Sequence, residues 1–313
     1  MGARKIIIDT DPGQDDAVAL LLAFASPEEL EVLAVTTVAG NVPLELTTRN
    51  ALTVCELAGR SDVPVHAGCD GPMTGTLKTA EAVHGQTGLD GVELPPPSTA
   101  PAPGHAVDIL IETLRREPAG TVTLCTLGAL TNVATAFARA PDIVERVAEI
   151  VVMGGAYFEV GNWSPAAEFN ILVDPEAAQI VFRAGRPLTI LPLDVTHKAL
   201  ITPDRLAAFG RIDSNVGRAV HGWLGFYERF DMAKYGWEGG PLHDPCVIAY
   251  LLKPDLFSGR FINVEVETQS ELTRGMTVAD WWNVTDRHAN ATFIGDVDAD
   301  GFYALLTDRL ARL

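Results

Sequence analysis

The chain has 313 residues, of which 47% are hydrophobic and 20% charged, so it can bury a sizeable core and is not disordered as a whole. Lysine and arginine total 23 against 41 acidic residues, and the net charge of -18 disfavours nucleic acid and anionic membranes as partners. Without an 18-residue apolar run, a signal-peptide pattern or a C-x-x-C pair, the chain is expected to be cytoplasmic and to lack a membrane span.

Strands and helices alternate along the first two thirds of the chain. The run Lys-Ile-Ile-Ile-Asp at residues 5–9 is typical of a buried parallel strand, and it ends at a Pro-Gly turn. Further strands are predicted at residues 31–37, 63–66, 121–126, 149–153 and 188–193. Helices are predicted at residues 15–26, 44–58, 106–116, 130–139 and 174–184. This alternation predicts an α/β fold with an open, mostly parallel, Rossmann-like sheet and helices on both faces.

The last third of the chain is predicted to be largely helical. A long helix spans residues 214–235, and a strand at 261–267 and a helix at 301–313 close the chain. The proline-rich residues 94–104 form a surface loop, but no shift in composition marks them as a linker. We therefore expect one domain over residues 1–313 with an additional helical C-terminal region.

Four carboxylates follow the first predicted strand within eight residues. Asp9 and Asp11 precede the Pro-Gly turn and Asp15 and Asp16 follow it. Their repulsion is costly unless a cation neutralises it, and ligands made only of oxygen select a hard ion such as Ca²⁺ or Mg²⁺. An acidic helix N-terminus would explain Asp15 and Asp16, but it would not explain the other two.

Further polar groups follow later strands, and ligands bind where parallel strands end. The turn at residues 127–132 offers backbone carbonyls. Asp244 begins a helix, where an aspartate is either a ligand or a cap; its position alone favours the cap. His84 lies between glycine hinges in a possible lid, although a lone histidine is expected at the surface. The loop after residues 149–153 carries groups that suit a sugar or that satisfy their own backbone: Asn162, Glu168 and Asn170.

Together these segments resemble the inosine-uridine-preferring nucleoside hydrolase family. Residues 9–16, D-T-D-P-G-Q-D-D, match the N-terminal pattern D-x-D-P-G-x-D-D of the family. Its other blocks follow in order: G-N at 40–41, L-G-A-L-T-N at 127–132, M-G-G at 153–155, E-F-N at 168–170 and H-D-P at 243–245. The match covers nearly the whole chain, so it is far more specific than Asp-x-Asp alone.

The resemblance implies Ca²⁺-dependent hydrolysis of the N-glycosidic bond of ribonucleosides to ribose and a free base. By position, calcium would be bound by Asp11, Asp16, Asp244 and the carbonyl of Leu127. The ribose would contact Asp15, Asn41, Met153, Asn162, Glu168 and Asn170. Asp11 would also activate water as general base, His243 would protonate the leaving base, and His84 would lie over it.

The resemblance also implies a homodimer or homotetramer and, through His243, pyrimidine nucleosides or inosine as substrates. Candidates for contacts with the base are Tyr227, Phe230, Lys234, Tyr235 and Trp237, while Trp223 and Trp237 are more often packing residues.

Two alternatives remain open. Asp-x-Asp also suits a haloacid-dehalogenase-like phosphatase, with Asp9 as nucleophile and Asp11 as acid/base. That enzyme would need a lysine and an acidic pair downstream, and Lys198 has no such pair beside it. The other alternative is a nucleoside-binding protein without catalysis.

Overall fold

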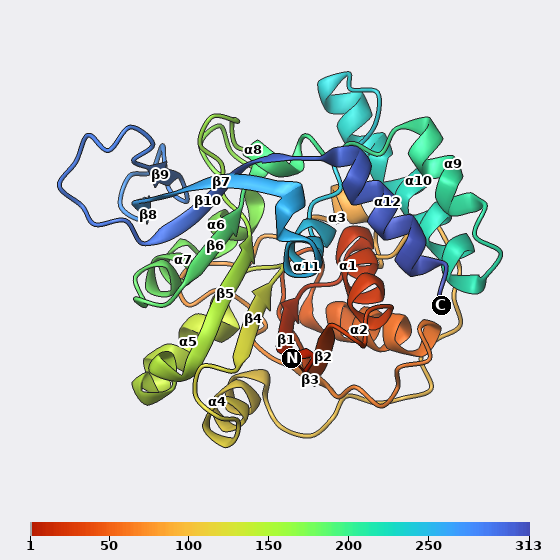
Figure 1. Cartoon of the computed structure of the whole chain (residues 1–313), viewed down its shortest axis with the longest axis horizontal. Coiled ribbons are helices and arrows are strands. Elements are labelled where there is room, and N and C mark those ends of the chain that lie inside the picture. The colour runs from red at the N-terminus through yellow and green to blue at the C-terminus, as the bar shows by residue number, and fades with distance from the viewer. Residues whose placement is uncertain (1) are drawn as a thin grey trace.

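An eight-stranded sheet forms the centre of the structure, a computed structural model that describes residues 2–313 (Figure 1). The strand order is β3-β2-β1-β4-β5-β6-β10-β7, and only β7 runs antiparallel to its neighbour. The strands are β1 (Arg4–Thr10), β2 (Leu30–Thr37), β3 (Val65–Ala67), β4 (Val122–Thr126), β5 (Val147–Met153), β6 (Leu188–Leu191), β7 (Phe257–Ile262) and β10 (Ala291–Val297). The predicted open, mostly parallel sheet is confirmed.

Helices cover both faces of this sheet, as predicted. Their bounds are α1 (Gln14–Phe24), α2 (Leu44–Leu57), α3 (Glu81–His84), α4 (Ala106–Arg116), α5 (Thr131–Arg139), α6 (Phe169–Val173), α7 (Pro175–Phe182), α8 (Leu193–Thr196), α9 (Pro203–Gly210), α10 (Asn215–Tyr235), α11 (Pro245–Leu252) and α12 (Ala299–Leu310), with short 3-10 turns η1 (Pro141–Arg146) and η2 (Pro254–Leu256). On one face α1, α2, α10, α11 and α12 share a core, and on the other α4, α5 and α7 share a second one (Figure 1). No helix within residues 2–313 is long and apolar enough to cross a membrane.

The central strand β1 shows why its sequence is almost entirely apolar. Ile6 and Ile8 point into the core that contains α1, whereas Ile7 points into the core that contains α4 and α5. Successive side chains of a strand face opposite sides, so a strand covered on both faces has no polar side. Helix α1 is buried along its whole length for the same reason.

The C-terminal region is helical as expected, but its strands were predicted poorly. The predicted strand at 261–267 is wrong, because Asn263 separates β7 from β8 (Val264–Val266), which pairs with β9 (Thr277–Ala279) in a second, two-stranded sheet. The sequence analysis missed β10, whose apolar run is interrupted by Gly295 and Asp296. The other predicted strands and helices overlap the observed elements, and residues 94–104 contain neither.

The strand order places the loops that matter beside one another. From β1 the chain builds outward to β3, and from β4 it builds in the opposite direction, so the order reverses between β1 and β4. Such a reversal leaves a crevice at the carboxyl ends of the strands, which is where open α/β sheets bind their ligands.

Candidate active site

A cavity lies at the carboxyl ends of these strands. Its empty volume, with the open solvent at its mouth included, is about 570 Å³. It brings together all the predicted site residues except Asp11 and Asp16. These lining residues are Asp15, Asn41, His84, Leu127, Met153, Asn162, Glu168, Asn170, His243 and Asp244. The remaining wall comes from Ala80, Val83, Trp163, Phe169, Tyr227, Phe230, Asp231, Lys234 and Tyr235.

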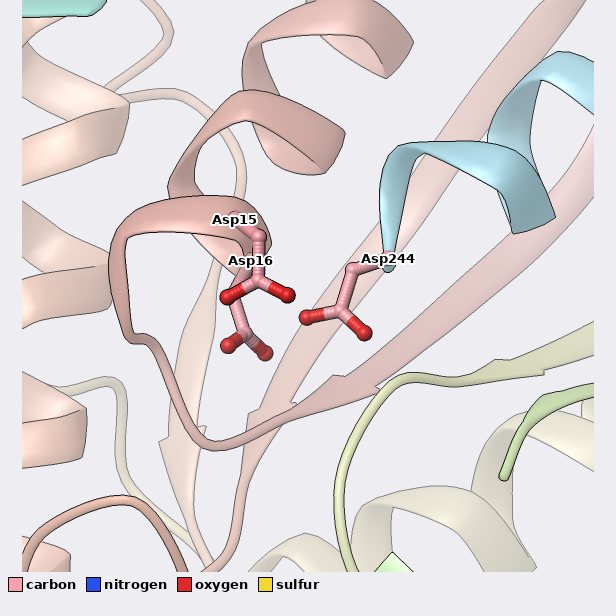
Figure 2. A group of neighbouring side chains, drawn as sticks. All are labelled: Asp15, Asp16 and Asp244. Atoms are coloured by element: carbon pink, nitrogen blue, oxygen red, sulfur yellow. The ribbon is translucent and has the colours of Figure 1, made fainter. Parts of the chain in front are cut away.

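Three carboxylates meet at one end of the cavity. Asp15 and Asp16 lie in the first turn of α1, and Asp244 directly precedes α11 (Figure 2). All three are buried, and one oxygen of each lies within 4.8 Å of the other two. Figure 2 shows the carboxylates of the two helix starts directed toward one another. This is a donor set that suits one hard divalent cation.

Asp11 lies beside this cluster, fully buried after the end of β1. Its Oδ2 accepts a hydrogen bond from the backbone N–H of Asn41 at 2.7 Å, whereas no group within residues 2–313 donates to Oδ1. A Cβ on Gly40 or Gly128 would collide with this carboxylate, so the two glycines allow their loops to close around it. A buried carboxylate oxygen without a donor indicates a binding partner such as a cation.

The electrostatics of the cluster lead to the same conclusion. Burial, with the charge of Asp16 in addition, raises the pKa of Asp11 well above its usual range and that of Asp15 to about 8. Burial and the charges of Asp15 and Asp16 also raise the pKa of Asp244 well above its usual range. Four ionised carboxylates would be unstable here by themselves, and a bound cation removes that cost. The residues therefore fit a hard metal ion.

Of the two aspartates that begin helices, one caps its helix and the other does not. Asp16 does close the first turn of α1, because it accepts from the backbone N–H of Gly13 at 3.0 Å, and it also accepts from Thr10 Oγ1 and from Asn41 Nδ2 at 3.0 Å. Asp244 makes no capping hydrogen bond to α11, so the cap favoured by its position is wrong. Its carboxylate turns instead toward the start of α1 (Figure 2).

Asp9 has a different role from its neighbours. Its Oδ1 accepts from Thr36 Oγ1 at 2.5 Å and from Asn132 Nδ2 at 2.8 Å, which links β1 to β2 and α5. Burial raises its pKa to about 7, and it does not line the cavity. A nucleophile must reach the substrate, so the phosphatase hypothesis loses the residue that it requires.

The opposite wall holds the loop after β5. Glu168 starts α6 and accepts from the backbone N–H groups of Asn170 at 2.9 Å, Gly155 at 3.0 Å and Ile171 at 3.2 Å. Burial raises the pKa of Glu168 to about 7, although these donors oppose the shift. The side chain thus satisfies its own backbone and still lines the cavity.

Two amides fix the rest of this wall. Asn170 Nδ2 donates to the backbone carbonyls of Leu127 at 2.6 Å and Met153 at 3.2 Å, and Asn162 Oδ1 accepts from the Phe169 N–H at 3.0 Å. The carbonyl predicted as a metal ligand, that of Leu127, is therefore in direct contact with a predicted sugar-binding amide.

Two buried histidines also line the cavity. His243 Nδ1 pairs with Thr196 Oγ1 at 2.7 Å, and burial lowers the pKa of His243 well below its usual range. His84 Nδ1 pairs with Gln14 Oε1 at 2.8 Å, and burial lowers its pKa to about 3. The expectation that a lone histidine at position 84 is a surface residue is wrong, because Gln14 and Tyr227 cover its ring.

Comparisons with known proteins decide the family. The sequence matches the family described as Inosine-uridine preferring nucleoside hydrolase over residues 6–304. The chain belongs to this family. It is an enzyme that hydrolyses N-glycosyl bonds of ribonucleosides.

Relatives of this hydrolase cover the whole chain. An uncharacterized protein of Schizosaccharomyces pombe is 54% identical over 309 residues, 99% of each chain. The pyrimidine-specific ribonucleoside hydrolase RihA of Photobacterium profundum is 48% identical over 311 residues, again 99% of each chain. A solved plant nucleoside hydrolase, 35% identical, matches the structure with a TM-score of 0.92 over 98% of this chain and 99% of that one.

The far end of the cavity in this hydrolase comes from the last turns of α10. Tyr227, Phe230, Lys234 and Tyr235 line it, as expected for four of the five candidates. Trp237 lies outside the lining and stacks on Tyr235, with ring centroids 4.5 Å apart and planes at 20°.

Packing explains the remaining residues at this end. Trp223 is completely buried in the core and is a packing residue, as its helical spacing indicated. The sequence analysis missed Thr196, Gln14 and Asp231. Asp231 follows Tyr227 by one helical turn, and that spacing is the signal that would have placed it on the same face.

Proposed function

We propose that this hydrolase cleaves pyrimidine ribonucleosides and inosine with the help of a bound Ca²⁺ ion, and releases ribose and the free base. The observation that carries the proposal is the buried carboxylate cluster of Asp15, Asp16 and Asp244 beside the unpartnered Oδ1 of Asp11. The pyrimidine preference is supported by the relative named pyrimidine-specific at 48% identity.

The ion would be bound by Asp11, Asp16, Asp244 and the carbonyl of Leu127. When bound, it would orient hydroxyl groups and water and lower the pKa of that water. Calcium accepts irregular sets of oxygen ligands, which fits carboxylates that come from two helix starts and a strand end. Magnesium demands a more regular octahedron and fits this set less well.

The ribose would lie between the cluster and the loop after β5. Asp15, Asn41, Met153, Asn162, Glu168 and Asn170 surround that space. Cleavage of a glycosidic bond passes through a sugar that carries positive charge, so carboxylates fixed around the ring stabilise the transition state. The three backbone donors of Glu168 hold its carboxylate in place without reorganisation.

Proton transfers would be made by two residues on opposite sides of the ribose. Asp11 would take the proton of the attacking water. His243 would give a proton to the leaving base from Nε2, because Nδ1 is engaged by Thr196. A histidine with a lowered pKa gives up its proton readily once it is protonated.

A turnover assay tests this function. Purified protein is stripped of metal with a chelator and given uridine, cytidine, inosine or p-nitrophenyl riboside, and ribose is measured as reducing sugar. We expect chelation to abolish ribose release and added Ca²⁺ to restore it. Activity that persists in verified metal-free protein would overturn the metal proposal. Nucleoside binding without any ribose release would leave a binding protein.

We also infer that residues 1–313 act as one catalytic domain in the cytoplasm and associate as a homodimer or homotetramer. Large apolar side chains are exposed around the β7 edge and support self-association: Phe158 is 60%, Phe261 66% and Trp282 72% exposed. Arg260 stacks on Trp281 and Trp282 and joins part of this surface together. The molar mass measured by light scattering, as the protein elutes from a size-exclusion column, would give the number of subunits.

A further inference from the structure

One carboxylate of the cavity takes no part in the mechanism above. Asp231, on α10, lines the cavity and is only 8% exposed. Within residues 2–313 no group donates a hydrogen bond to its oxygens; the charge of Lys234 lowers its pKa, but the two side chains form no ion pair. The ammonium of Lys234 donates instead to the carbonyl of Asn162 at 2.7 Å.

An unpartnered buried carboxylate is costly, and this one stays ionised near neutral pH. Burial raises the pKa of Asp231 to about 6, while Lys234 opposes the shift. Because no protein group donates to this carboxylate and it lines the cavity, a ligand can supply its donor. Sites built in this way discriminate strongly between ligands that carry the donor and ligands that lack it.

The position of Asp231 indicates which part of a nucleoside it meets. Asp231 follows Tyr227 by one turn of α10, and the Tyr227 ring lies against that of His84, with ring centroids 5.5 Å apart. The Asp231 carboxylate also lies beside Gly240, in the segment that leads to His243. With the ribose at the cluster and His243 at the base, Asp231 would meet the edge of the base that is remote from the sugar.

In a pyrimidine nucleoside that remote edge carries the 4-substituent. Cytosine presents an amino group there, which donates hydrogen bonds, whereas uracil presents a carbonyl, which accepts them. We propose that Asp231 accepts a hydrogen bond from the 4-amino group of the base and so makes cytidine a better substrate than uridine. This inference rests on the proposed nucleoside hydrolysis and adds the choice between the two pyrimidines.

The test compares kcat/KM for cytidine and uridine in the wild type, Asp231→Asn and Asp231→Ala. The wild type should favour cytidine. Asp231→Asn can donate to the 4-carbonyl, so the cytidine-to-uridine ratio should fall at least about tenfold. Asp231→Ala, which offers neither a donor nor an acceptor, should lose cytidine turnover more than uridine turnover.

Two controls make the result unambiguous. Glu228→Gln removes a half-buried carboxyl of the same helix that does not line the cavity, and its ratio should equal that of the wild type. Turnover of p-nitrophenyl riboside, which has no 4-amino group, reports whether each variant folds and cleaves the sugar bond.

An unmoved ratio in variants that still cleave p-nitrophenyl riboside would overturn the assignment of Asp231. A wild type that favours uridine and loses this preference in Asp231→Asn would also overturn it, because Asp231 would then meet the N3–H of uracil. Absence of cleavage of every riboside by the wild type would instead refute the proposed function.

Discussion

The two ends of the cavity are built on different principles. At the end proposed to bind the sugar, two of the charged groups are fixed by several donors: Asp16 accepts from Thr10, Gly13 and Asn41, and Glu168 accepts from three backbone N–H groups. At the end proposed to bind the base, helix α10 supplies aromatic rings and a carboxylate, Asp231, to which no group within residues 2–313 donates.

Because of this difference, we expect one end of the cavity to control cleavage and the other to control the choice of base. Changes to the sugar end must disturb several strands at once, and they should affect all substrates alike. Changes to the base end alter one helix and should affect substrates according to their base.

Replacement of Asp11 should have the largest effect. Asp11→Ala removes the proposed general base and one proposed metal ligand, so kcat should fall at least about a hundredfold for every nucleoside and for p-nitrophenyl riboside. Steady-state kinetics with saturating Ca²⁺ measure this loss. The exposed Asp70 provides the control, and Asp70→Ala should retain activity. Near-normal turnover in Asp11→Ala would refute the proposed mechanism.

His243→Ala should depend on the substrate. Loss of a general acid typically costs 10²-fold to 10⁴-fold, so uridine turnover should fall by about that factor. Turnover of p-nitrophenyl riboside should fall much less, because nitrophenolate leaves without a proton. The ratio of the two kcat values measures the acid role, and equal slowing of both substrates would exclude it.

Gly40, which lies against the Asp11 side chain, offers a test of the sugar end that removes no polar group. Gly40→Ala adds a methyl group that collides with the Asp11 carboxylate, so kcat/KM should fall roughly tenfold to hundredfold for all substrates. Gly71→Ala is the matched control, because a Cβ there meets no atom within 4 Å. Activity of Gly40→Ala equal to that of Gly71→Ala would show that the position of Asp11 tolerates displacement.

The smallest expected effect is on stability. The pKa of Asp231 is about 6 against an ordinary 3.8, so its ionised form destabilises the folded state above pH 6, and this cost disappears as the pH falls toward 4. Without nucleoside, Asp231→Asn should therefore be more stable than the wild type by about 3 kcal/mol at pH 7 and nearly equal at pH 4. Urea unfolding at the two pH values measures the difference; an equal gain at both would contradict it.

More of the residues at the proposed sugar end than at the proposed base end could be predicted from the sequence. Carboxyl ends of parallel strands converge, so the strand alternation was sufficient to predict the sheet and to bring most site residues to one edge. The role of Asp244 depended on whether its side chain turned back to its own helix, which no local pattern decides. His84 is buried by residues from distant segments, which its local sequence does not reveal. Strand β10 was not predicted because Gly295 and Asp296 interrupt its apolar run. Asp231 was missed because a charge on a helix is usually solvated.

Asp16 belongs to two structures at once, the first turn of α1 and the carboxylate cluster. Because α1 is buried along its whole length, it can form only together with the core. The free energy of ion binding at this cluster would then add to the free energy of unfolding of the chain. Under this linkage, removal of the ion should lower the free energy of unfolding and raise protease sensitivity as well as stop turnover.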